Sequence, residues 1–165
     1  VDGLHMARFY ENLAAELERR GTPKKIIASG GSCCVHDKYR PETVEQLRAK
    51  YPGIQIVAHP ECPIEVCRLC DYVGSTKGMA AFVEKSSART FGMLTEFGLV
   101  NRMEAEHPDK TFVWPFGTCS YMKRNTLTNT LQALAAPLPE QEVHVDPATA
   151  AAAYKAIEKM FELTK

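Results

Sequence analysis

The stretch IVAHPECPIEVCRLCDYVGSTKGM, residues 56–79, sets the pattern of the fold. An apolar run ends in His59 and Glu61, a short run with helical spacing follows, and a second brief apolar run ends in Ser75 and Thr76. Open α/β sheets build their sites from polar residues that come directly after the strands, beyond the carboxyl edge. The stretch therefore predicts imidazole, carboxylate and hydroxyl groups gathered at one edge of such a sheet.

The same alternation of apolar and amphipathic runs continues through the chain. Helices are predicted at residues 5–20, 42–51, 64–70, 77–86, 97–107, 125–134 and 148–163, and strands at 24–29, 54–58, 71–73, 89–94 and 110–114. Strands and helices that alternate with short connections form parallel sheets joined by right-handed crossovers, with helices on both faces. The expected fold class is three-layer α/β/α with short parallel sheets.

The composition excludes several classes of protein. Hydrophobic residues make up 45% of the 165 residues, which is enough for a substantial core. Twenty basic and twenty acidic side chains cancel, so no overall charge favours nucleic acid or an anionic membrane as a partner. No apolar run approaches the roughly 18–20 residues of a membrane span, and we expect a cytoplasmic protein. The chain begins at Val1 without an initiator Met, which suggests further sequence upstream.

Two of the six cysteines, Cys67 and Cys70, are expected to pack in the core, whereas the pattern does not decide this for Cys62, which directly follows Glu61 on the turn. Cys62, Cys67 and Cys70 have C-x4-C-x2-C spacing, and with Cys119 they match the plant-type pattern for a two-iron cluster. The residues around Cys67 and Cys70 have helical apolar spacing, however, and cysteine on such a face usually packs as a small hydrophobe. A small iron–sulfur electron carrier that uses these four thiols remains an alternative.

Two other cysteines have a context that suits a metal ligand. Cys33 and Cys119 each follow a predicted strand and a Gly-containing turn, so each is either a ligand or a buried thiol. In an extended segment Cys34 would point away from Cys33. A zinc site from Cys33, His36, His59 and Cys119 is also possible, although the spacing lacks a zinc signature. Spacing alone leaves the metal open.

Five ordered motifs resemble those of the quinolinate synthase family. They are G-x-C-x-V-H at 31–36, H-P-E-C at 59–62, V-G-S-T-x-x-M at 73–79, T-E-x-G-L-V-x-R at 95–102 and C-x-x-M-K at 119–123. The resemblance implies three similar α/β domains that each give one cysteine to a [4Fe-4S] cluster with one open iron. It also implies the condensation of iminoaspartate with dihydroxyacetone phosphate to quinolinate, in de novo NAD biosynthesis.

The resemblance assigns roles to particular residues of this chain. The cluster ligands are Cys33 and Cys119. The substrate pocket contains His59, Pro60, Glu61, Ser75 and Thr76. Glu61 and His59 are the implied catalytic residues, with Glu61 as the group that moves protons. Ser75 and Thr76 precede a predicted helix, so they form either an anion site or simply a helix cap.

The resemblance covers only the C-terminal half of the family pattern. Residues 1–40 correspond to the end of the middle domain, 41–135 to the third domain, and 136–165 to an extended segment and a C-terminal helix. The third cluster cysteine is absent from this chain, so missing N-terminal domains or another chain would complete the site. The alternative is a non-catalytic short relative that binds a dicarboxylate or a partner chain.

Overall fold

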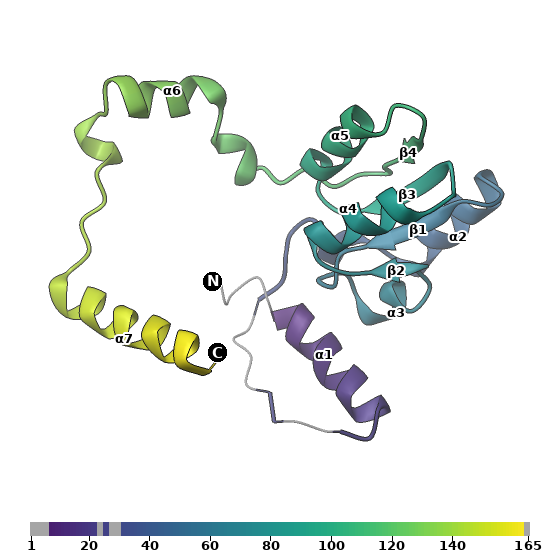
Figure 1. Cartoon of the computed structure of the whole chain (residues 1–165), viewed down its shortest axis with the longest axis horizontal. Helices are drawn as coiled ribbons and strands as arrows, with labels where there is room; N and C mark the ends of the chain where they lie inside the picture. The colour runs from purple at the N-terminus through teal and green to yellow at the C-terminus, as the bar shows by residue number, and fades with distance from the viewer. Residues whose placement is uncertain (1–6, 23–24, 27–30, 164–165) are drawn as a thin grey trace. The chain divides into compact units, whose positions relative to one another are not determined.

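The structure is a computed structural model, and it describes residues 7–22, 25–26 and 31–163 (Figure 1). The chain divides into two compact units, residues 1–120 and residues 121–165. The first unit contains the sheet and all the site residues named above. The predicted strand at 24–29 lies largely outside the described residues.

The first unit is built on a four-stranded parallel sheet. Its strands are β1 (Gln55–Ala58), β2 (Tyr72–Val73), β3 (Thr90–Leu94) and β4 (Thr111–Val113), in the order β2-β1-β3-β4. Ala58 at the end of β1 pairs with Val73 on one side and with Leu94 on the other. The carboxyl ends of the three strands are therefore level, and the predicted strands in this part of the chain are confirmed.

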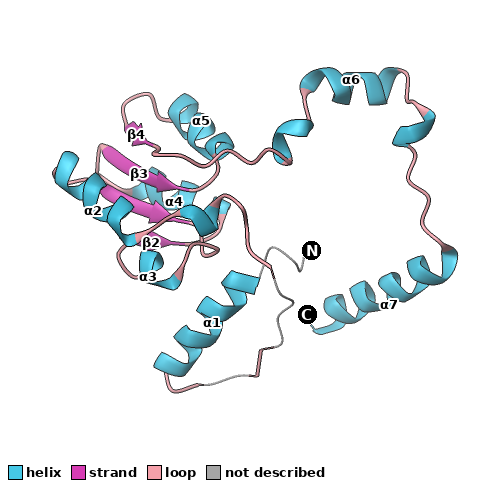
Figure 2. Cartoon of the chain, turned by 180° about the vertical axis from the view of Figure 1, so that it is seen from behind, coloured by secondary structure: helices cyan, strands magenta, loops and turns pink. Residues whose placement is uncertain are grey.

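Helices cover both faces of the sheet, as expected (Figures 1 and 2). On one face α2 (Pro41–Lys50) and α3 (Ile64–Cys67) pack against the sheet through the buried residues Tyr39, Val44, Leu47, Ile54, Ile56, Ala58, Cys62, Val66 and Leu94. On the other face α4 (Thr76–Lys85) and α5 (Phe97–Glu106) bury Val57, Met79, Val83, Phe91, Met93, Leu99, Val100, Met103 and Phe112. The expected three-layer α/β/α arrangement is confirmed.

Side-chain alternation along the strands explains the two cores. Ile56 and Ala58 belong to the core under α2 and α3, whereas Val57 between them belongs to the opposite core. In β3, Gly92 leaves room for α2, because a Cβ there would lie 3.2 Å from Leu47 Cδ1. Continuous apolar strands are typical of parallel sheets that are buried on both faces.

The strand order creates a topological switch point between β1 and β3. These strands are neighbours, but β1 leads into α3 on one face while β3 leads into α5 on the other. The chain therefore leaves the two strand ends in opposite directions. Open α/β sheets bind their ligands in the crevice that this divergence leaves.

The remaining helices match the predictions with small shifts. They are α1 (Ala7–Arg19), α6 (Leu127–Ala135) and α7 (Pro147–Leu163), with short 3-10 turns at His36–Lys38, Met122–Arg124 and Pro139–Gln141. The helix expected at 64–70 ends at Cys67, because the chain already turns toward β2. Thr126 caps α6 by accepting a hydrogen bond from the Asn129 backbone N–H at 3.2 Å. Within the described residues, no helix has the length and apolar character needed to cross a bilayer.

Gly117→Ala should destabilise the first unit strongly. Gly117 has φ +131°, and a Cβ there would lie 2.7 Å from both the Thr95 carbonyl oxygen and the Tyr39 hydroxyl. Strain and overlap together should lower the free energy of unfolding by about 2 kcal/mol or more. Gly53→Ala is the matched control, because Gly53 has φ +81° with nothing within 4 Å. Chemical denaturation measures both, and equal losses would contradict the close packing at Gly117.

Candidate functional site

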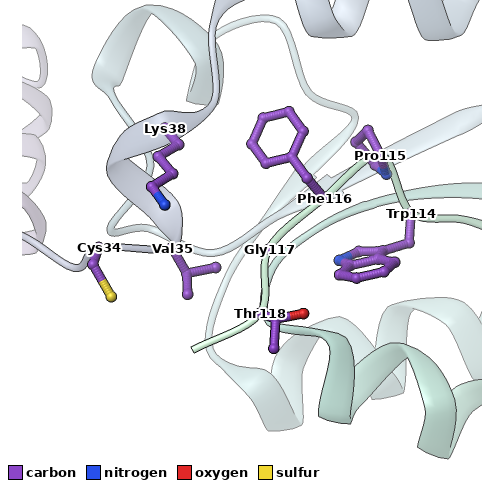
Figure 3. Close-up of a pocket in the computed structure, with 8 residues that line it drawn as sticks. All are labelled: Cys34, Val35, Lys38, Trp114, Pro115, Phe116, Gly117 and Thr118. Carbon is purple, nitrogen blue, oxygen red and sulfur yellow. The ribbon is translucent and has the colours of Figure 1, made fainter. Parts of the chain in front are cut away.

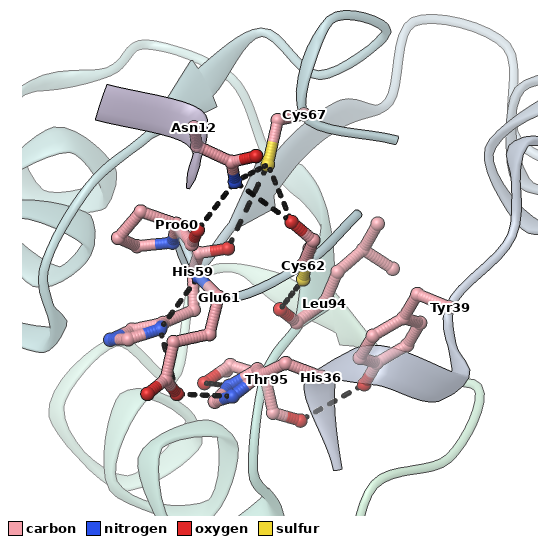
Figure 4. A network of polar contacts seen from close by, with 10 residues as sticks. All are labelled: Asn12, His36, Tyr39, His59, Pro60, Glu61, Cys62, Cys67, Leu94 and Thr95. Atoms are coloured by element: carbon pink, nitrogen blue, oxygen red, sulfur yellow. Dashed lines mark hydrogen bonds and ion pairs between the residues drawn. The ribbon is translucent and has the colours of Figure 1, made fainter. Parts of the chain in front are cut away.

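His36 lies at the centre of a buried polar network at the switch point (Figure 4). Its Nδ1 is 2.9 Å from Glu61 Oε2, and its Nε2 is 3.3 Å from Thr95 Oγ1. Glu61 lies in the turn after β1, and Thr95 directly follows β3. The 3-10 turn His36–Lys38, which precedes α2, thus places the His36 imidazole between the diverging ends of β1 and β3.

The second imidazole, of His59, packs directly on the first. The His36 and His59 rings stack with centroids 4.5 Å apart and an interplanar angle of 19°. The Glu61 backbone N–H donates to His59 Nδ1 at 3.3 Å, and Glu61 Oε2 lies 3.4 Å from the same nitrogen. Both catalytic residues that the sequence suggested therefore meet at this point, and His36 joins them.

The two imidazoles differ in charge. Burial opposes protonation of His36, but its contacts with Cys33 and Glu61 outweigh burial and raise its pKa to about 9. Burial and the neighbouring His36 lower the pKa of His59 to about 4. Near neutral pH the site therefore holds an imidazolium beside the Glu61 side chain and a neutral imidazole stacked on it. The two imidazoles and the Glu61 side chain can therefore hold a proton and transfer it near a bound molecule.

Cys33 adds a thiol to the same group of residues. Burial opposes its ionisation, but contact with the His36 side chain and with the backbone N–H groups of His36 and Val35 lowers its pKa. One ligand atom from each of Cys33, His36 and Glu61 lies within 4.8 Å of the others. Among the described residues, these three could hold a metal.

Cys119 lies on the other side of the switch point, at the end of the segment after β4. Its backbone N–H donates to Glu96 Oε1 at 3.3 Å, and Glu96 Oε2 accepts the Gly98 N–H at 2.6 Å. Glu96 is therefore the N-cap of α5. The same carboxylate fixes the backbone that carries the Cys119 thiol.

Cys34 faces the segment that leads to Cys119. Residues 34–38 form a turn and a 3-10 helix, so the expectation for an extended segment does not apply here. Cys34 and Lys38 line a pocket of about 500 Å³ with Gly117 and Thr118 (Figure 3). Desolvation, followed by the neighbouring Cys119 thiol, raises the pKa of Cys34. Three thiols therefore lie along this edge of the first unit.

Ser75 and Thr76 lie at the same edge, one strand away from Glu61. The Gly74 N–H donates to the Ala58 carbonyl at 3.1 Å, which ties the end of β2 to the end of β1. Ser75 Oγ accepts the Gly78 N–H at 3.2 Å and caps α4. The capping role is confirmed for Ser75, and binding of an anion by Ser75 and Thr76 at this helix start stays a prediction.

Asn12 on α1 holds the turn that carries Glu61. Its Nδ2 donates to the Pro60 carbonyl at 2.7 Å and to the Cys62 carbonyl at 3.0 Å. The sequence gave no signal for this role, because the partners are backbone groups 48 and 50 residues away. Helix α1, which precedes the sheet in the chain, therefore fixes the backbone at Pro60.

The cysteines of the ferredoxin-like spacing lie in or against the core. Cys62 Sγ donates to the Leu94 carbonyl at 3.6 Å, and Cys70 Sγ to the Val66 carbonyl at 3.2 Å. Burial raises the pKa of the Cys67 thiol to about 11 and that of Cys70 to about 12, and it also raises that of Cys62. The packing prediction for Cys67 and Cys70 is confirmed, and this argues against the electron carrier.

Fold and site together define an α/β protein whose thiols, imidazoles and carboxylate meet at a topological switch point. Residues 10–162 match the family described as "Quinolinate synthetase A protein", and the chain belongs to that family. It is 38% identical over 153 residues to "Quinolinate synthase 2" of Mesorhizobium japonicum, covering 91% of this chain and 44% of that protein. It is 39% identical over 145 residues to "Quinolinate synthase" of Thermotoga maritima, covering 86% of this chain and 48% of that protein. The chain thus spans less than half the length of these relatives.

Thiol alkylation should follow the environments of the cysteines. At pH 8 a thiol with a pKa of about 11 is ionised in only about one molecule in a thousand, so Cys67 and Cys70 should react slowly. Cys33, whose pKa is lowered, should be labelled much earlier by iodoacetamide. Peptide mass spectrometry after short pulses measures the order, with denatured chain as the control. Equal labelling of Cys33 and Cys70 in the folded chain would contradict these environments.

Proposed function

We propose that this chain supplies the C-terminal part of a quinolinate synthase that acts in the cytoplasm. The reaction would condense iminoaspartate with dihydroxyacetone phosphate to give quinolinate, in de novo NAD biosynthesis. The observation that carries the proposal is the meeting of Cys33, His36, His59 and Glu61 at the switch point, since they come from two of the motifs shared with the family. The printed names of the relatives support it.

This chain would supply two of the thiolate ligands of the proposed [4Fe-4S] cluster. Cys33 and Cys119 would hold it, because iron–sulfur clusters are bound by thiolates and the pKa of Cys33 is lowered. When bound, the cluster would supply a Lewis-acidic iron with an open position. A third thiolate would come from protein outside these 165 residues or from another chain. We also propose that residues 1–40 are the end of the middle domain, that 41–135 form the third domain, and that 136–165 form an extended segment and a C-terminal helix.

The residues of this chain would divide the acid–base work. Glu61 moves protons during condensation and dehydration, because its carboxylate reaches both imidazoles. His36 keeps that carboxylate in position. His59 accepts the Glu61 N–H at Nδ1, which leaves its Nε2 available to donate to a substrate carboxylate or carbonyl. Ser75 and Thr76 hold an anionic group of the substrate at the start of α4.

The same edge of the sheet also supports one alternative. A non-catalytic protein that binds a dicarboxylate or a partner chain through that edge is the second candidate. The presence or absence of quinolinate formation in the complete protein distinguishes the two.

Cys33→Ser and Cys119→Ser should each abolish iron–sulfur binding in the complete protein. Each variant removes a thiolate from the edge of the sheet, and serine oxygen is a poor ligand for the cluster. Cys67→Ala is the matched control, because that thiol lies against the core and donates to the Cys62 carbonyl. Anaerobic iron and sulfide counts decide the matter. Cluster loss in Cys67→Ala with retention in Cys33→Ser would reverse the assignment.

Glu61→Gln should leave the cluster in place and lower quinolinate turnover by roughly 10²-fold or more, as expected for loss of a positioned acid–base group. Glu65→Gln on the exposed side of α3 is the control, with turnover expected to stay near the original value. Steady-state quinolinate production measures both variants. Near-normal turnover of Glu61→Gln would reduce Glu61 to a structural partner of His36.

A further inference from the structure

We propose that Asn12 of α1 is a positioning residue that fixes the tautomer of His59 through a single peptide group. The proposal deepens the proposed function and rests on it, because it names the residue that keeps the proton of His59 on Nε2, where it can be donated to the substrate. The carrying observation is a chain of two hydrogen bonds (Figure 4). Asn12 Nδ2 donates to the Pro60 carbonyl at 2.7 Å, and the N–H of the same peptide, that of Glu61, donates to His59 Nδ1 at 3.3 Å.

The Pro60–Glu61 peptide lies at the centre of a turn. The Cys62 N–H donates to the His59 carbonyl at 3.0 Å and closes this turn. The orientation of the central peptide is what distinguishes the common types of β-turn, so a contact from outside the turn can fix it. Asn12 supplies that contact, since its amide also donates to the Cys62 carbonyl at 3.0 Å. In a planar trans peptide the N–H points opposite to the carbonyl, so holding the Pro60 carbonyl aims the Glu61 N–H at His59.

Two arrangements compete for the Nδ1 atom of His59. Glu61 Oε2 lies 3.4 Å from this nitrogen, so a protonated Nδ1 would donate to the carboxylate. An unprotonated Nδ1 instead accepts the Glu61 N–H. The two are exclusive, because the backbone N–H cannot donate to a nitrogen that already carries a proton. The stacked ring of His36 restrains rotation of the His59 ring, so the orientation of the peptide decides between them.

The hydrogen bond from Asn12 favours the second arrangement. Donation to a carbonyl polarises the peptide and strengthens its N–H as a donor. The proton of the neutral His59 ring is then held on Nε2. In Figure 4 this nitrogen points away from the other residues drawn, and the His59 side chain is 19% exposed. Asn12 therefore keeps a hydrogen-bond donor on the open side of the site without touching the substrate itself.

Nitrogen-15 NMR of the labelled 165-residue chain tests the tautomer. At pH 8 the pKa of His59, about 4, keeps the ring neutral, and protonated and unprotonated ring nitrogens have well-separated shifts. We expect an unprotonated Nδ1 in the original chain. Asn12→Leu keeps the shape of the side chain but donates nothing, and it should shift the ratio of the two tautomers about five-fold toward the Nδ1–H form, as for loss of one ordinary hydrogen bond.

Two further variants complete this measurement. Asn12→Asp, which also loses the amide donor, should shift the ratio in the same direction. Asn101→Leu at an exposed position of α5 is the matched control and should leave the ratio unchanged. Circular dichroism checks the fold of each chain. An unchanged ratio in either folded Asn12 variant would overturn the proposal. An Nδ1–H tautomer in the original chain would overturn it without any variant, so the test stays decisive if a variant fails to fold.

Kinetics of the complete protein test the consequence for the reaction. Asn12→Leu should lower the kcat of quinolinate formation by about 10-fold, with iron and sulfide contents unchanged, because the donor on His59 is misplaced. Full turnover in a variant whose tautomer has shifted would overturn the role of Asn12 in the reaction. Absence of quinolinate from the unaltered complete protein would instead overturn the proposed function, and the NMR result would still stand.

Discussion

The buried contact between His36 and Glu61 is the interaction on which the site depends. It joins residues that are 25 positions apart and closes the segment before α2 onto the turn after β1. Through His36 it also reaches Thr95 after β3, so one imidazole spans both strand ends of the switch point. A buried pair of this kind stabilises its surroundings only while both partners are present, because either one alone would be an uncompensated buried group.

The sheet order explains why these particular motifs meet. Because β1 and β3 are neighbours whose connections leave on opposite faces, the turns after them open away from each other and leave space beyond the sheet. The segment at 31–39 enters that space from outside the sheet. Tyr39 holds it there by donating to the Thr95 and Phe116 carbonyls, and Gly117 permits the close approach. These contacts help to position Cys33 and His36 at the edge of the sheet.

Much of this could be predicted from local sequence, and the remainder depended on distant contacts. Apolar periodicity located the helices and strands of the first unit to within a few residues, and the polar residues after each strand indicated the correct edge. The sequence could not give the strand order. It also gave no signal that His36 contacts Glu61 and Thr95, because these residues are 25 and 59 positions away. Cys34 was expected to point away from Cys33 in an extended segment, whereas the chain turns there and brings Cys34 to Cys119.

A double-mutant cycle on the free energy of unfolding tests the central role of the His36–Glu61 contact most directly. His36→Ala, Glu61→Ala and the double variant of the 165-residue chain are compared by chemical denaturation. If the pair organises the site, each single change costs about 3–5 kcal/mol and the double change costs clearly less than their sum, with a coupling of about 1–3 kcal/mol. Additive losses, within about 0.5 kcal/mol, would contradict that role.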